Sequence, residues 1–228
     1  FRLVPHGACM ATPRVPSNAA PDTFGISPLL GIRGFAEALG RARALSTLAP
    51  DNVTSYDYIV DAAAALGKYP EAEQAAQWML NLRPSYVISL TRAALMREVF
   101  GDSDGAIELM QRAYQRIDPH DVEERAWHST RIAEMYLAAG RIDAADRTLN
   151  EALSIFPDYH LALGQLARVR LAQGRAYDAV MIESRRQQFV PCAENICAVA
   201  ISLTSRGETT EHHPECAQWA TANKRQVK

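Results

Sequence analysis

Residues 126–159 read AWHSTRIAEMYLAAGRIDAADRTLNEALSIFPDY, and this stretch decides the fold. Its first half has apolar residues at the spacing i, i+3, i+4, i+7, which is one face of a helix: Ile132, Met135, Tyr136 and Ala139. Gly140 ends that helix, because glycine adopts the left-handed conformation at little cost. A second apolar face follows and stops before Pro157, whose ring clashes with a continuing helix. Its members are Ala145, Leu149, Ala152 and Leu153. The stretch therefore predicts two antiparallel amphipathic helices.

This helix pair recurs along the chain with a period close to 34 residues, which is typical of repeat architectures. A glycine closes the first helix-like segment of each unit, at Gly67, Gly101, Gly140, Gly174 and Gly207. An alanine lies five residues after most of these glycines, at Ala72, Ala106, Ala145 and Ala179. Four clear repeats over residues 53–191 follow from this register.

The pattern resembles the tetratricopeptide repeat. A repeat of that family has a small residue at its eighth position, a large one at its eleventh, alanine at its twentieth and proline at its thirty-second. The unit 126–159 has these residues at Ala133, Tyr136, Ala145 and Pro157. The unit 53–86 departs from the pattern, because Val60 and Ala63 reverse the order of small and large. The resemblance implies an all-α, right-handed α-solenoid of antiparallel helix pairs.

The rest of the chain is organised around these repeats. We expect residues 1–26 to form an extended arm and residues 27–228 to form a single solenoid domain. Its divergent end units are 35–50 and 193–224, and the helix expected within 20–33 is short or absent, because that stretch holds a proline and two glycines. Five extra residues precede Ala126, where Asp121 fits an N-cap with Glu124 reaching back. This predicts a first helix from about 122 to about 139.

Composition excludes several classes of protein. The formal net charge is −2, which argues against a nucleic-acid partner held by charge, because phosphate binding needs a basic surplus or stripe. No apolar run is long enough for a transmembrane segment. The bias toward Ala and Arg is typical of bacteria with GC-rich genomes.

The N-terminus shows no signal-peptide pattern. The run LVPHG at residues 3–7 resembles a protease site left by cloning, although His6 replaces the arginine that such a site needs. Residues 1–10 are therefore either native or a cloning remnant. The compartment, cytoplasmic or exported, stays open.

The sequence favours neither an enzyme nor a cofactor-binding protein. The segment Gly101–Gly105 is acidic and lies between two helices, so it predicts a turn and no nucleotide site. Asp57 and Asp61 share one helix face and are interpreted as a solvated acidic patch. His128 is interpreted as a surface or rim histidine, because the adjacent Ser129 points elsewhere.

The C-terminal segment is the one candidate metal site. Its zinc-type ligands lie within 25 residues and include Cys192, Cys197, His212, His213 and Cys216. His212 and Cys216 are four residues apart on one helix face, which suits a metal ion. Cys197 borders an apolar helix, where a free thiol is commonly buried. Unlinked thiols are the main expectation; a disulfide and a metal site are the alternatives.

The resemblance implies a scaffold that binds a protein or peptide in a concave groove lined by the first helix of each repeat. The expected groove residues are Asp57, Asp61, Ile88, Thr91, Leu95, Trp127, Thr130, Glu134, Leu161 and Arg168. Ile88, Leu95, Trp127 and Leu161 are large apolar groups that the core is not expected to need, although Trp127 alternatively packs under the segment 119–125. We expect a peptide with apolar anchors and a basic end over Asp57 and Asp61. The alternatives are a metal-binding or enzymatic role of the C-terminal cluster, and self-assembly through the terminal units.

Overall fold

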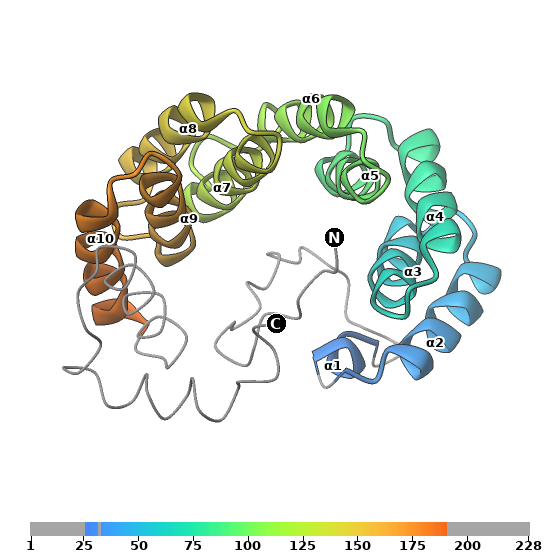
Figure 1. Cartoon of the computed structure of the whole chain (residues 1–228). Coiled ribbons are helices and arrows are strands. Elements are labelled where there is room, and N and C mark those ends of the chain that lie inside the picture. Colours follow the sequence, from blue (N-terminus) through green and yellow to red (C-terminus); the bar gives the residue numbers. More distant parts are fainter. Residues whose placement is uncertain (1–25, 32, 191–228) are drawn as a thin grey trace. The chain divides into compact units, whose positions relative to one another are not determined.

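The computed structural model describes residues 26–31 and 33–190, and every regular element in this part is a helix (Figure 1). The helices are α1 (Ile26–Gly31), α2 (Phe35–Leu48), α3 (Val53–Ala65), α4 (Tyr69–Leu82), α5 (Val87–Val99), α6 (Ser103–Tyr114), α7 (Val122–Ala138), α8 (Ile142–Ile155), α9 (His160–Ala172) and α10 (Ala176–Phe189). The expected all-α class and the helix pairing are confirmed.

The described residues divide into two compact units, with the boundary between residues 128 and 129 inside α7. We call residues 26–128 the N-terminal unit and residues 129–190 the C-terminal unit. In the N-terminal unit α5 packs against both α3 and α4, and α2 packs against α3. In the C-terminal unit α9 packs against α8 and α10. The helix expected within 20–33 is the six-residue α1, which confirms a short first helix.

The helices begin and end where the sequence predicts. Asn52 caps α3, because its side-chain oxygen accepts a hydrogen bond from the Thr54 N–H at 3.0 Å. Asp102 caps α6 in the same way by accepting from Gly105, so the acidic glycine segment is a turn. The described glycines that close first helices all have positive φ: Gly67 (74°), Gly101 (86°), Gly140 (74°) and Gly174 (74°).

The long helix α7 confirms the predicted early start. Asp121 accepts a hydrogen bond from the Glu124 N–H at 3.1 Å, which satisfies one of the free donors of the first turn. The second hydrogen bond expected of the capping box would run from the Asp121 N–H to the Glu124 side chain. The Asp121 N–H instead donates to the Asp118 carbonyl at 2.9 Å. The five extra residues thus form a turn and the first part of α7.

Small side chains make up much of the core. In the N-terminal unit Ala62, Ala63, Ala72 and Ala76 are fully or almost fully buried. Val60 is also buried. This repeat has its large residue first and its small residue, Ala63, second, and both lie in the core. Alanine leaves room for two helix backbones to approach closely, because its side chain is a single methyl group.

The last described repeat differs from the others at two core positions. The twenty-fourth and twenty-seventh positions of the first three repeats are apolar and buried: Ala76 and Met79, Met110 and Ala113, and Leu149 and Ala152. In the fourth repeat they are Glu183 and Arg186, which form an ion pair at 3.2 Å. Burial raises the pKa of Glu183, with Arg186 opposing the shift. The apolar periodicity is therefore interrupted on α10.

Replacing Ala145 by tryptophan tests this packing. Ala145 is fully buried on α8, so an indole there must displace neighbouring helices. We expect the free energy of unfolding to fall by about 1–3 kcal/mol or more, because overpacking a dense core forces side chains and backbone to shift. Arg147→Trp, on the exposed face of the same helix, is the matched control. Thermal denaturation of both variants measures the effect, and equal melting temperatures would show that the repeat register is wrong.

Candidate functional site

The expected groove residues lie on α3, α5, α7 and α9, and they fall in both units. Asp57 and Asp61 are on α3, and Ile88, Thr91 and Leu95 are on α5. The remaining ones are Trp127, Thr130 and Glu134 on α7, and Leu161 and Arg168 on α9. Because the unit boundary follows residue 128, the surfaces of the two units are described separately.

Asp57 and Asp61 share one guanidinium group. Arg92 on α5 donates from Nε to Asp57 at 2.5 Å and from Nη2 to Asp61 at 2.7 Å. The side chain of Arg92 is only 13% exposed, and those of Asp57 and Asp61 are 17% and 39% exposed. The interpretation as a solvated acidic patch is wrong, because Arg92 from the next repeat lies between the two carboxylates.

This cluster keeps one net negative charge when all three groups are ionised. Burial raises the pKa of Asp61 to about 6; the Arg92 charge lowers it and the Asp57 charge raises it further. Asp61 is the most exposed of the three side chains, so it is the one that solvent or a ligand can reach. Arg92 lies about one repeat length after both carboxylates, and that spacing was the signal that could have identified the cluster.

The fifth position of each repeat points toward the neighbouring helices and away from the surface. It holds Asp57, Thr91, Thr130 and Gly164, of which the last three are buried. Thr91 is 7% exposed and Thr130 is 4% exposed. The prediction that Thr91 and Thr130 line a groove surface is therefore wrong. Not every residue on this face of the first helices reaches the surface, because packing against neighbouring helices covers the fifth position.

Two of the apolar residues contribute to the core as well as to the surface. Ile88 and Leu95 are half-buried and pack against the hydrophobic core of the N-terminal unit. The expectation that the core does not need them is wrong, because both side chains contact this core and α5 packs against α3 and α4. Leu161 on α9 and Trp127 on α7 are also half-buried. All four leave part of their surface open to a ligand.

His128 is buried, which corrects its interpretation as a surface histidine. It is 3% exposed, its Nε2 lies 2.9 Å from the Thr91 hydroxyl and its Nδ1 lies 3.0 Å from the Glu124 carbonyl. Since a carbonyl only accepts, Nδ1 carries the proton and Nε2 accepts from Thr91. Burial lowers the pKa of His128 to about 4, against opposing effects of the Glu124 carbonyl and the Asp121 charge. The Trp127 ring meets the imidazole edge-on at 4.7 Å.

Glu134 is the centre of a second polar network, in the C-terminal unit. It accepts hydrogen bonds from Arg131 and from Gln165 Nε2, the latter at 2.9 Å. Arg168 donates to Gln165 at 3.0 Å and lies 3.9 Å from Glu134. Arg168 is 58% exposed, so it is the charge of this network that a ligand meets first.

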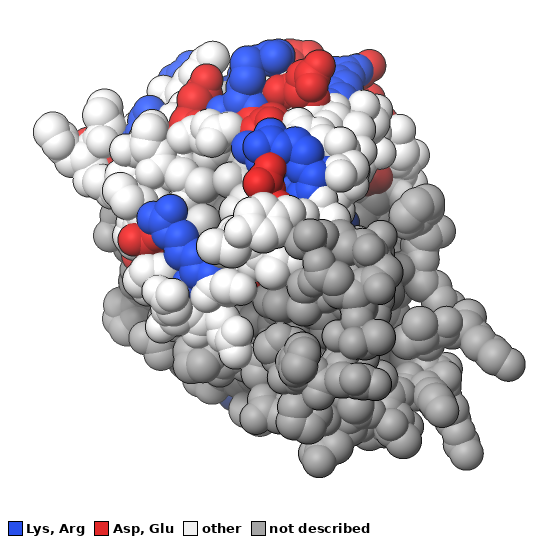
Figure 2. Space-filling view, turned by 60° about the vertical axis from the view of Figure 1, so that its left-hand side comes forward, with Lys and Arg blue, Asp and Glu red and all other residues white. Residues whose placement is uncertain are grey.

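Charge pairing extends over the surface of the C-terminal unit. Arg170 on α9 pairs with Asp146 on α8 at 2.5 Å, and Arg175 pairs with Asp178 at 2.6 Å. Among the described residues on the face shown in Figure 2, acidic and basic side chains lie next to one another. Such a surface does not favour a ligand through bulk charge of one sign.

Solved structures with low sequence identity share this architecture. The type IV pilus biogenesis factor PilW superposes with a TM-score of 0.75 at 14% identity, over 89% of this chain and 92% of PilW. A thermophilic tetratricopeptide-repeat protein from Thermus thermophilus gives 0.67 at 17% identity, over 78% of this chain and 95% of that one. This chain has the tetratricopeptide-repeat fold.

A third similar structure is MamA from Desulfovibrio magneticus RS-1, with a TM-score of 0.58 at 13% identity over 72% of this chain and 89% of that one. No protein-family model and no curated protein sequence matches the chain. In the tetratricopeptide-repeat fold, α3, α5, α7 and α9 are the first helices of the four repeats and α4, α6, α8 and α10 are the second.

The candidate metal ligands belong to the C-terminal segment. Cys192, Cys197, His212, His213 and Cys216 lie outside the described residues. Within residues 26–31 and 33–190, no three His, Cys, Asp or Glu side chains gather as a metal site would require. In the same part of the chain, no helix combines the length and the apolarity needed to cross a bilayer. Metal analysis and thiol titration of the full chain test the C-terminal cluster directly.

Proposed function

We propose that this tetratricopeptide-repeat protein is a scaffold that binds a peptide segment of a partner protein on its first helices. The observation that carries the proposal is the pairing of charges on these helices. Arg92 neutralises one of two carboxylates on α3, and Glu134 is held by Arg131 and Gln165. Because these charged side chains already pair within the protein, the contacts that remain for a ligand on these helices are mainly apolar.

The apolar anchors differ between the two units. Ile88, Leu95 and Trp127 serve the N-terminal unit, and Leu161 serves the C-terminal unit. Trp127 is the strongest candidate, because tryptophan is enriched among residues that dominate interface energies. Its ring packs edge-on against the buried His128, which holds it in one orientation and lowers the entropy lost on binding.

Charge favours a particular orientation of the ligand. The Asp57–Asp61–Arg92 cluster has one net negative charge, and Asp61 is its exposed member. We propose that a basic end of the peptide lies over Asp61. In the C-terminal unit the exposed Arg168 favours an acidic or carbonyl-rich part of a ligand.

Removing the tryptophan anchor tests the proposal. Once a partner segment has been captured and mapped, Trp127→Ala should weaken its binding by about 2 kcal/mol, or roughly 30-fold, measured by titration calorimetry. Trp78→Ala is the matched control, because Trp78 is a more exposed tryptophan that lies on the second helix α4. We expect Trp78→Ala to bind the segment as the unchanged protein does.

Hydrogen exchange locates the bound segment independently. Protection of α3, α5, α7 and α9 is the expected result. If the partner binds Trp127→Ala with unchanged affinity and protects only α4, α6 and α8, the first-helix assignment is wrong. Asp61→Asn should act mainly on the association rate and its salt dependence, because a partly exposed charge steers encounter more than it stabilises the complex.

A further inference from the structure

The last described second helix, α10, has charged residues on its inward side and apolar residues on its outward side. Its inward side holds the buried Glu183 and its partner Arg186. Its outward side holds Tyr177 and Met181, which are 58% and 53% exposed. Because successive residues of an α-helix are about 100° apart, Met181 lies about 160° from Glu183, and Tyr177 lies about 180° from Arg186. At these residues the polarity of α10 is the reverse of that of an ordinary amphipathic helix.

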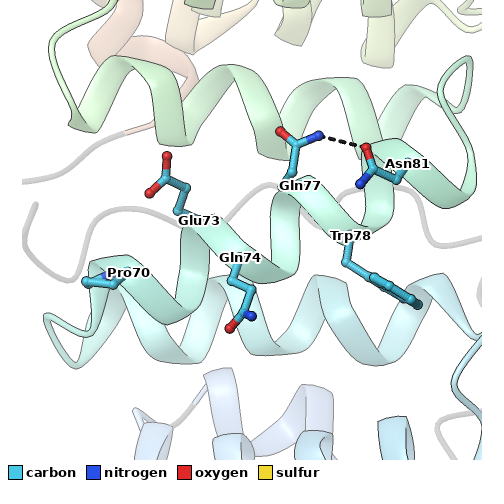
Figure 3. Close-up of a pocket in the computed structure, with 6 residues that line it drawn as sticks. All are labelled: Pro70, Glu73, Gln74, Gln77, Trp78 and Asn81. Carbon is cyan, nitrogen blue, oxygen red and sulfur yellow. Dashed lines mark hydrogen bonds between the residues drawn. The ribbon is translucent and has the colours of Figure 1, made fainter.

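The second helices of the first three repeats do not show this reversal. The residues at the repeat positions of Tyr177 and Met181 are all exposed, and none of them is a large apolar residue: Pro70 and Gln74 on α4, Asp104 and Glu108 on α6, and Asp143 and Arg147 on α8. Figure 3 shows the first two at the surface of α4, where they help to line a pocket. The inward equivalents of Glu183 and Arg186 are buried apolar residues in all three repeats. The reversal therefore belongs to α10 and is not a property of the repeat.

The guanidinium group of Arg186 lies directly against the backbone of α9. A Cβ atom added to Gly164 would be 2.8 Å from Nη1 of Arg186 and 2.9 Å from its Cζ, which is closer than a side chain allows. The other repeats have a side chain at this fifth position: Asp57, Thr91 and Thr130. Arg186 therefore occupies a space that exists because residue 164 is a glycine.

The hydrogen bonds of Arg186 compensate its burial only in part. Arg186 donates to both carboxylate oxygens of Glu183 from a single nitrogen, Nη1, at 3.4 and 3.2 Å. Its Nε is buried and has no hydrogen-bond partner among the described residues. An unmet donor and the desolvation of two charges both oppose the packing of α10 on α9. Separation of the two helices would return these groups to water.

Apolar burial holds α10 less firmly than it holds α8. The buried residues of α10 are Ala179 and Glu183, whereas those of α8 are Ala145, Leu149 and Ala152. Burial of apolar surface is the main favourable contribution to packing, and α10 leaves two of its large apolar side chains exposed on its outward side. The closed position of α10 thus gains little from apolar contacts and buries two charges.

We propose that α10 opens away from α9 as a local unit while α8 and α9 stay folded, and that the Glu183–Arg186 pair sets how often it opens. The protein then exchanges between a closed state, in which α10 covers α9 at Gly164, and an open state, in which it does not. Cooperative segments less stable than the whole fold open in this way. The equilibrium is a point of regulation, because a ligand that binds one state better shifts it. The proposal does not depend on peptide binding to the first helices.

Hydrogen exchange in the full-length chain tests the local opening. After correction for intrinsic rates, we expect the amides of α10 to exchange at least about tenfold faster than those of α8. Low concentrations of urea should change the α10 rates little, because a local opening exposes little surface, and should raise the α8 rates more steeply. An equal urea dependence in the two helices would show that they open together, which would overturn the proposal.

Substitution of the charged pair tests its role. Glu183→Leu with Arg186→Met puts apolar side chains of similar volume in the same space and should slow exchange in α10 by about tenfold, because such replacements of a buried ion pair are often stabilising. Gln188→Met, at an exposed site on the same helix, is the matched control and should leave the α10 rates unchanged. If the double variant exchanges as fast as the unchanged protein, the charged pair does not set the opening of α10 and the proposal is wrong.

Discussion

Arg92→Met is expected to lower the free energy of unfolding by about 3 kcal/mol. Removing one partner of a buried ion pair leaves an uncompensated charge, which costs about 3–5 kcal/mol when the site is fully buried. Here two carboxylates lose their shared guanidinium, whose side chain is 13% exposed. The partial exposure of Asp61 places the effect at the lower end of that range.

Two comparisons isolate the cause of this loss. Asp57→Asn with Asp61→Asn should recover much of the stability of the Arg92→Met variant, because the buried charges are then absent. Arg168→Met removes an arginine that is 58% exposed and should change stability little. Urea denaturation of these proteins measures the differences. An Arg92→Met loss no larger than that of Arg168→Met would show that the cluster does not stabilise the fold.

His128 is expected to make the fold less stable in mild acid. Burial lowers its pKa from 6.5 to about 4 in the folded protein. As the pH falls through 6.5, the unfolded chain takes up a proton at this residue and the folded protein does not. Stability is therefore lost between about pH 7 and pH 4, by up to about 3 kcal/mol, and the loss levels off below pH 4.

Asp61 has the opposite effect on the pH dependence of stability. Its folded pKa of about 6 lies above the usual 3.8, so the folded protein takes up a proton first and gains stability as the pH falls through 6. The contribution of His128 to the pH dependence of stability is therefore measured by comparing a variant that lacks this histidine with a variant that keeps it. Urea denaturation from pH 7.5 to pH 4 should show that His128→Gln removes the acid-induced loss. His120→Gln, at an exposed site, should retain it. The assignment fails if the two variants respond equally to acid.

The helix pairs of this protein are determined by local sequence. Amphipathic spacing, the N-caps Asn52 and Asp121 and the left-handed glycines each act within a few residues, so the sequence alone placed the helices and the repeat register. The tetratricopeptide-repeat fold followed from that register. The early start of α7 was also predictable, because a capping residue and acids in the first turn mark it.

The candidate site depended on contacts between repeats. Thr91, Thr130 and His128 lie on the predicted stripe or beside it, but neighbouring helices cover them. Whether such a flanking residue is exposed depends on the angle at which the next helix packs, and helical spacing does not encode that angle. Arg92 joins Asp57 and Asp61 for the same reason: residues 31 and 35 positions apart become neighbours only when the repeats stack. Local periodicity determined the helices, and tertiary packing decided which of their side chains a ligand can reach.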